Sequence, residues 1–108
     1  MIEVKFKEYD ILIGQNEKEN DQLVKTSDPN DYWLHLYGVP SPHAVIKNPS
    51  EKRIHQKILK RAAYLVKINS KFKSQSKISV DITRIKHLET TEKLGSVILH
   101  ELTKQIEV

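Results

Sequence analysis

The chain has 108 residues, a net charge of +4 and no cysteine. Its length fits one domain with a single hydrophobic core, and the lack of cysteine excludes disulfide bonds and thiolate metal sites. No apolar run approaches the ~20 residues of a membrane-spanning helix. Residues 2–5 alternate in polarity where a signal peptide would be apolar, so we expect a cytoplasmic protein without a membrane segment.

The basic residues are concentrated in one part of the chain. Residues 51–77 contain nine Lys or Arg and one acidic residue, whereas residues 1–50 have a net charge of −3 and residues 78–108 of −1. Such an asymmetry indicates a polyanionic partner more strongly than the overall charge does.

Two strands and a short helix are predicted at the beginning of the chain. Apolar and charged residues alternate over 2–6, and residues 9–13 form a second strand after a short turn. A short helix follows over 16–25, because Asn16 is a good helix cap and Glu19 can bond back to the cap amide.

Two further strands are predicted in the centre. Residues 27–31 form a turn rich in Asp and Asn. The strand over 32–36 places Trp33 and His35 on one face, because side chains alternate along a strand. After a rigid, proline-containing connector, residues 43–47 form the next strand.

The next element is predicted to be a long amphipathic helix that reaches about residue 70. Ser50 is its expected cap, with Glu51 in the first turn. Apolar residues repeat at helical spacing and basic residues fill much of the remaining surface. The apolar stripe is led by Ile54, Ile58, Leu65 and Phe72.

The last part of the chain reads as three strands. They are expected over 78–83, 95–99 and 105–108, with a loop over 84–93 that has room for one helical turn. The predicted fold class is α+β, a mostly antiparallel or mixed β-sheet packed with one long basic amphipathic helix and one short helix.

Several motifs occur in a fixed order along the chain. They are Gly14-x-Asn16-x-x-x-Asn20-Asp21-x-Leu23, Asp31-x-Trp33-Leu34-His35, Pro40-Ser41-Pro42-His43-x-Val45-Ile46, Ala63-Tyr64-Leu65-Val66-Lys67-x-Asn69-Ser70, Val80-x-Ile82-Thr83 and Gly95-Ser96-Val97. The ordered set resembles the NFACT-R domain, the RNA-binding module of the NFACT proteins of ribosome-associated quality control, which also occurs in small eukaryotic relatives.

The chain departs from this family at two places. Gln15 stands where the family usually has a basic residue, and Pro40-Ser41-Pro42-His43 stands where the family commonly reads Pro-Gly-Ser-His. The larger NFACT proteins also carry a helix-hairpin-helix part and a long coiled coil, neither of which is found in this sequence. We therefore expect one NFACT-R-like domain over residues 1–108.

The resemblance implies contact with nucleic acid or the ribosome. We expect structured RNA, either tRNA or rRNA, in a translation quality-control setting, with DNA as an alternative polyanion and without a cofactor. The basic helix would contact phosphates and the Asn16–His43 segment would provide selectivity; the alternative is an ordinary solvated helix face. The candidate nucleic-acid-binding residues are Lys57, Lys60, Arg61, Lys67, Asn69, Lys71, Lys73, Asn16, Asn20, His35 and His43.

His35 and His43 also admit other interpretations. With Asp31 they are candidates for general acid–base catalysis or metal binding, which would make the protein a small phosphodiester- or nucleotide-directed enzyme. Equally, each His can satisfy its nitrogens on neighbouring backbone. Trp33 belongs to the core or to a pocket floor, or stacks on a base. We assign no catalytic residue and no metal, and a protein-interaction module remains a third hypothesis.

Overall fold

Six strands form one antiparallel sheet in the computed structural model, which describes residues 1–48 and 51–108. The strand order is β1-β2-β4-β3-β5-β8. Their bounds are β1 Ile2–Phe6, β2 Tyr9–Ile13, β3 Tyr32–Leu36, β4 Ala44–Ile46, β5 Ser79–Arg84 and β8 Lys104–Glu107. Two shorter strands, β6 (Leu88–Thr90) and β7 (Val97–Leu99), pair with each other in a separate antiparallel hairpin.

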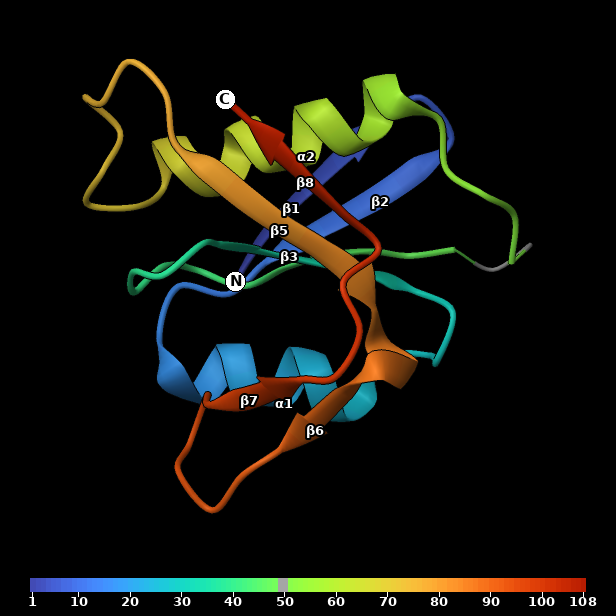
Figure 1. Cartoon of the computed structure of the whole chain (residues 1–108). Coiled ribbons are helices and arrows are strands. Elements are labelled where there is room, and N and C mark those ends of the chain that lie inside the picture. The colour runs from blue at the N-terminus through green and yellow to red at the C-terminus, as the bar shows by residue number, and fades with distance from the viewer. Residues whose placement is uncertain (49–50) are drawn as a thin grey trace.

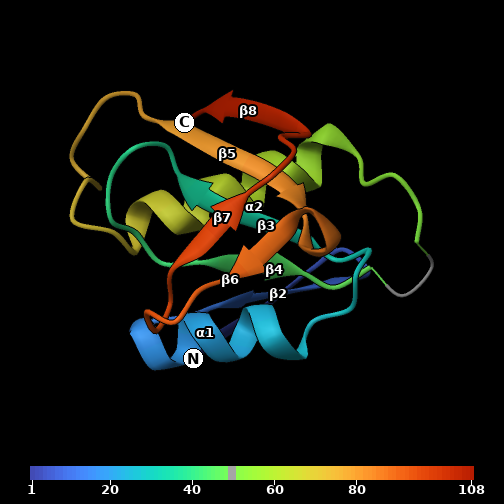
Figure 2. The same ribbon diagram turned by 60° about the horizontal axis from the view of Figure 1, so that its bottom comes forward.

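The sheet is the middle layer of three. Figure 1 shows α2 (Gln56–Ile68) on one side of the sheet, with α1 (Glu17–Thr26) and the β6–β7 hairpin on the other. Figure 2 brings the second side forward, where α1 and the hairpin lie next to each other. None of the helices described is long and apolar enough to span a bilayer.

Each face of the sheet has its own hydrophobic core, because successive side chains point to opposite faces. The larger core lies under α2 and contains Leu34 and Leu36 of β3. The smaller core lies under α1 and the hairpin and contains Trp33, which is 3% exposed. The predicted division of β3, with Trp33 and His35 on one face and the leucines on the other, is confirmed.

The predicted fold class is wrong because it expects one long helix as a main element of the fold. α2 has 13 residues and α1 has 10, so neither helix dominates and the helix content is modest. Every strand pair found in the described ranges is antiparallel, which also excludes the mixed sheet there. The structure is a small α+β domain built around its antiparallel sheet.

α2 starts later than predicted because residues before it are held in a non-helical conformation. Glu51 has a φ of 57°, and the side-chain amide of Asn48 donates a hydrogen bond of 2.7 Å to the carbonyl of Lys52. The first turn is instead capped by His55, whose Nδ1 accepts from the amide of Lys57 at 3.1 Å. The expected cap, Ser50, lies outside the described residues.

Side chains end α2 close to the predicted position, with Asn69 as its cap. The side-chain Nδ2 of Asn69 donates to the carbonyl of Leu65 at 2.8 Å, and the hydroxyl of Ser70 donates to the carbonyl of Lys67 at 2.7 Å. Local bonds of this kind compete with helix continuation. The loop predicted over 84–93 contains a single 3-10 turn, Ile85–His87, as allowed for, but also the strand β6, which the sequence pattern missed.

Candidate nucleic-acid interface

The outer side of α2 carries three of the predicted phosphate contacts. Lys57, Lys60 and Arg61 are exposed and lie on one side of the helix, opposite the stripe that packs on the sheet. None of the ion pairs in residues 1–48 and 51–108 includes these three side chains. We call Lys57, Lys60 and Arg61 the α2 basic face.

Two exposed apolar side chains lie within the α2 basic face. Tyr64 is 46% exposed and Ile68 is 37% exposed. Tyr64 follows Lys60 by four residues and Arg61 by three, so it shares their side of the helix. Sequence reasoning missed Tyr64 as a site residue, although this helical spacing was a usable signal. An exposed ring beside cations can stack on a nucleobase.

The remaining basic candidates do not share this face. Lys71 and Lys73 are exposed, but they lie in the loop after α2. Lys67 is only 8% exposed, and its Nζ is 3.5 Å from the carbonyl oxygen of Ser76. The ammonium group of Lys67 is therefore directed to the protein itself in this structure.

His43 stands at the centre of a hydrogen-bonded cluster beneath α1. Its Nδ1 accepts from Trp33 Nε1 at 3.0 Å, its amide donates to Asn20 Oδ1 at 3.1 Å, and its carbonyl accepts from the amide of Gly14 at 2.9 Å. Only 3% of His43 is exposed. We call Gly14, Asn20, Trp33 and His43 the His43 cluster; it joins β2, α1, β3 and β4.

The side chain of Asn20 takes up the space that a Gly14 side chain would need. A Cβ atom on Gly14 would lie 2.2 Å from Asn20 Oδ1, so glycine is required by this close approach. α1 is held at its start by Asn16, whose Oδ1 accepts from the amide of Glu19 at 2.9 Å. The Glu19 carboxylate accepts from the amide of Gln15, not from that of Asn16 as predicted.

The two predicted His residues are neighbours, because β3 and β4 pair with each other. Their ring centroids are 5.0 Å apart, and the His35 ring stacks on Trp33 at 5.5 Å. A pocket of about 250 Å³ borders the pair, with Asp81 and the β6–β7 hairpin among its walls.

Burial favours the neutral form of both His residues. Burial lowers the pKa of His43 to about 3, and the neighbouring His35 acts in the same direction. Burial also lowers the pKa of His35, against the effect of its bond with the Leu36 carbonyl, 2.6 Å from Nδ1. At neutral pH, proton transfer from a cationic His43 is therefore unavailable.

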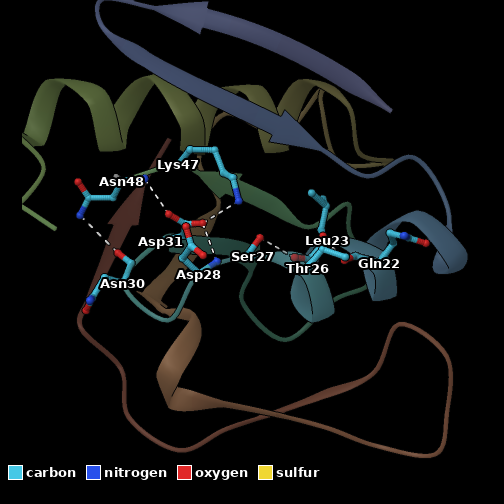
Figure 3. A network of polar contacts seen from close by, with 9 residues as sticks. All are labelled: Gln22, Leu23, Thr26, Ser27, Asp28, Asn30, Asp31, Lys47 and Asn48. Atoms are coloured by element: carbon cyan, nitrogen blue, oxygen red, sulfur yellow. Dashed lines mark hydrogen bonds and ion pairs between the residues drawn. The ribbon is translucent and has the colours of Figure 1, made fainter. Parts of the chain in front are cut away.

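Asp31 does not join the His pair. Its carboxylate pairs with Lys47 at 2.8 Å and accepts from the amides of Asp28 at 2.9 Å and Asn48 at 2.7 Å (Figure 3). In the register of β3 and β4, Asp31 lies at one end and His35 at the other, roughly 13 Å along the strand. The three candidate catalytic residues thus form two separate sites.

Four predicted site residues do come together. Asn16 and Asn20 of the α1 start and Asn69 and Lys71 after α2 line one pocket of about 360 Å³. We call it the α1 pocket. Within the ranges that the structure describes, no cluster of His, Asp and Glu has the composition of a metal site.

Comparison with known proteins gives a consistent result. Residues 3–100 match the family described as the NFACT protein RNA-binding domain. The chain is 34% identical over 82 residues to the Rqc2 homolog RqcH of Bacillus subtilis (strain 168), covering 73% of this chain and 14% of that protein. It is 32% identical over 65 residues to coiled-coil domain-containing protein 25 of Mus musculus, covering 57% of this chain and 31% of that protein.

A solved structure shares the fold. The C-terminal part of the fibronectin/fibrinogen-binding protein from Streptococcus suis superposes with a TM-score of 0.84 at 26% sequence identity. The match covers 93% of this chain and 40% of that one. The chain therefore spans a minor part of each of these relatives.

Proposed function

The chain belongs to the NFACT protein RNA-binding domain family, and we propose that it binds structured RNA, either tRNA or rRNA, as a single module over residues 1–108. The observation that carries the proposal is the α2 basic face. Its three cations have no ion-pair partner in the described ranges, and the surrounding segment 51–77 has a single acidic residue. Cations that the protein leaves unneutralised attract phosphates, whose binding releases condensed counterions.

The relatives support a quality-control setting for this binding. A protein named Rqc2 homolog RqcH contains a segment 34% identical to this chain, and from this we infer a role on ribosomes or tRNA in the cytoplasm. The family description names RNA, which favours RNA over DNA. The interpretation as an enzyme receives no support from the separation of Asp31 from the His pair.

Charge reversal on α2 tests the proposal. We expect Lys57→Glu, Lys60→Glu and Arg61→Glu together to remove most affinity for tRNA and to reduce the slope of log K against log salt by about 3, because each lost phosphate contact contributes about 0.9. Fluorescence anisotropy with labelled tRNA and with an rRNA hairpin, at two or more salt concentrations, measures both quantities.

A matched variant controls for net charge. Lys18, Lys86 and Lys93 are exposed and belong to the layer on the other side of the sheet. Their triple change to Glu lowers the net charge equally but should leave most of the binding intact. Equal losses in both variants, or an unchanged α2 variant, would contradict the proposal. If duplex DNA binds more tightly than either RNA, the proposed ligand would be DNA instead of RNA.

A further inference from the structure

The α1 pocket lies between three segments that are far apart in the sequence. Residues 15–17 and Asn20 form one wall, the connector 40–42 a second, and residues 69–71 a third. Its volume of about 360 Å³ falls in the range of small-ligand pockets. It differs from the α2 basic face because most of its lining is uncharged.

Asn20 presents an unpaired donor in this pocket. The residue is 8% exposed, and its Oδ1 is fixed by the amide of His43 and by the close approach of Gly14. In residues 1–48 and 51–108, the Asn20 Nδ2 group has no hydrogen-bond partner. This amide group is open to the pocket, so it can donate to a ligand that accepts hydrogen bonds.

Asn16 and Asn69 are exposed, but each also has one half of its side-chain amide bonded to the protein. The Oδ1 of Asn16 caps α1, which leaves its Nδ2 without a partner in the part of the chain described. The Nδ2 of Asn69 is bonded to the Leu65 carbonyl, which leaves its Oδ1 as an acceptor. One half of each side chain fixes the other half in place, so that donors and an acceptor are oriented before any ligand arrives.

The other walls favour a flat ligand over a phosphate. Pro40 and Pro42 add rigid apolar rings, while the hydroxyl of Ser41 is occupied by the Leu36 amide at 3.0 Å and the Pro42 carbonyl at 2.8 Å. Glu17 also lines the pocket, and its carboxylate repels a phosphate. A phosphate only accepts hydrogen bonds, whereas a nucleobase edge both donates and accepts.

From these walls, and resting on the proposed RNA binding, we infer that the α1 pocket holds one unpaired nucleobase that carries an exocyclic amino group. The amino group donates to Asn69 Oδ1 or Glu17, ring nitrogen or keto acceptors receive the Asn16 and Asn20 amides, and the base lies against the proline rings. Lys71 at the same pocket meets the phosphate of that nucleotide. Uracil has no exocyclic amine and fits least well.

Ribonucleosides test the pocket without any phosphate. In NMR titrations of the whole chain, adenosine, guanosine or cytidine should shift the side-chain amide signals of Asn16, Asn20 and Asn69. Uridine should shift them less, and inorganic phosphate should leave them unchanged. A response to phosphate alone, or equal silence toward all four nucleosides, would overturn the assignment. This readout does not depend on whether the α2 basic face binds RNA.

A neutral substitution tests the same pocket in RNA binding. Asn16→Ser keeps a capping oxygen but removes the unpaired amide. We expect affinity for single-stranded RNA rich in the preferred base to fall about 5- to 10-fold, as for one lost hydrogen bond, with an unchanged salt slope. Gln75→Ser, which removes an exposed amide outside the pocket, is the matched control.

The two proposals can fail separately. Full binding by Asn16→Ser together with silent nucleoside titrations overturns the base pocket and leaves the α2 basic face as proposed. If nucleosides bind but the α2 charge-reversal variant keeps its full affinity for RNA, the pocket is supported and the proposed phosphate surface is overturned.

Discussion

The two faces of the sheet carry polar residues in opposite situations. Beneath α1, the polar groups of the His43 cluster bond to one another and join four elements. Over the other face, Lys57, Lys60 and Arg61 are exposed, and no ion pair in the described ranges includes them, although the Arg61 guanidinium lies 5.6 Å from the centre of the Phe6 ring.

This difference separates folding from binding. Buried polar groups that satisfy each other hold a structure together, whereas unneutralised surface cations contribute little to folding and remain available to a partner. The family motif residues Gly14, Asn20, Trp33 and His43 therefore act first as a structural cluster. The α1 pocket lies at its border, where Asn20 belongs to both.

The largest expected effect is the loss of stability in acid through His43. Its pKa is 6.5 in a model peptide and about 3 in the folded protein. Below pH 6.5 the His43 imidazole is protonated in the unfolded chain but stays neutral in the folded chain. The free energy of unfolding therefore falls as the pH falls. The loss is about 1.4 kcal/mol per pH unit, or about 3 kcal/mol at pH 4.5. Urea unfolding at pH 7 and pH 4.5 measures it.

His43→Asn provides the comparison for this effect. Its Oδ1 can accept from Trp33 Nε1 in place of the ring nitrogen, but it does not titrate. Hydrogen bonds and nearby positive charge lower the pKa of Glu19 and Asp21, and these carboxylates act in both proteins. The difference in pH dependence therefore isolates His43. Parallel curves for the two proteins would show that the imidazole is not held neutral.

Gly14→Ala should have the next largest effect. The new Cβ would lie 2.2 Å from Asn20 Oδ1 and 3.0 Å from its backbone nitrogen, and Asn20 is held by His43. We expect a loss of about 2 kcal/mol in the free energy of unfolding, typical of an overpacked site.

Gly38→Ala separates steric clash from backbone strain. Gly38 has a φ of +71° but nothing within 4 Å of an added Cβ, so only the left-handed conformation costs free energy, about 1 kcal/mol. Denaturant curves for both variants rank the two effects. A smaller loss at Gly14 than at Gly38 would mean that the His43 cluster can move apart easily.

Local sequence patterns predicted most of the strands and both sides of β3, because alternation directly reflects which face is buried. They failed where individual contacts outside the repeating pattern determine the backbone conformation. The start of α2 depends on Asn48 holding the Lys52 carbonyl, and β6 exists through its pairing with β7. Neither contact leaves a periodic signal in the sequence.

The candidate site shows the same limit. Sequence analysis proposed Asn16, Asn20 and Asn69 as nucleic-acid-binding candidates, but it did not predict that they line one pocket. It also grouped Lys67 with the exposed lysines, since position on a helix alone does not reveal that the following loop covers a side chain. Only the three-dimensional arrangement distinguishes an amide that is fully bonded from one with a free half.

Tyr64→Ala should have the smallest effect and bears most directly on the contrast between the two faces. Tyr64 is 46% exposed, so its removal should change the free energy of unfolding by less than about 0.5 kcal/mol. If a base of the bound RNA stacks on its ring, affinity for single-stranded RNA should fall at least about 5-fold, since one stacking contact contributes roughly 1 kcal/mol or more. Tyr37→Ala, at a ring 62% exposed and outside α2, should leave RNA binding unchanged. Equal affinities for both variants in anisotropy titrations would restrict the α2 basic face to phosphate contacts and leave base recognition to the α1 pocket.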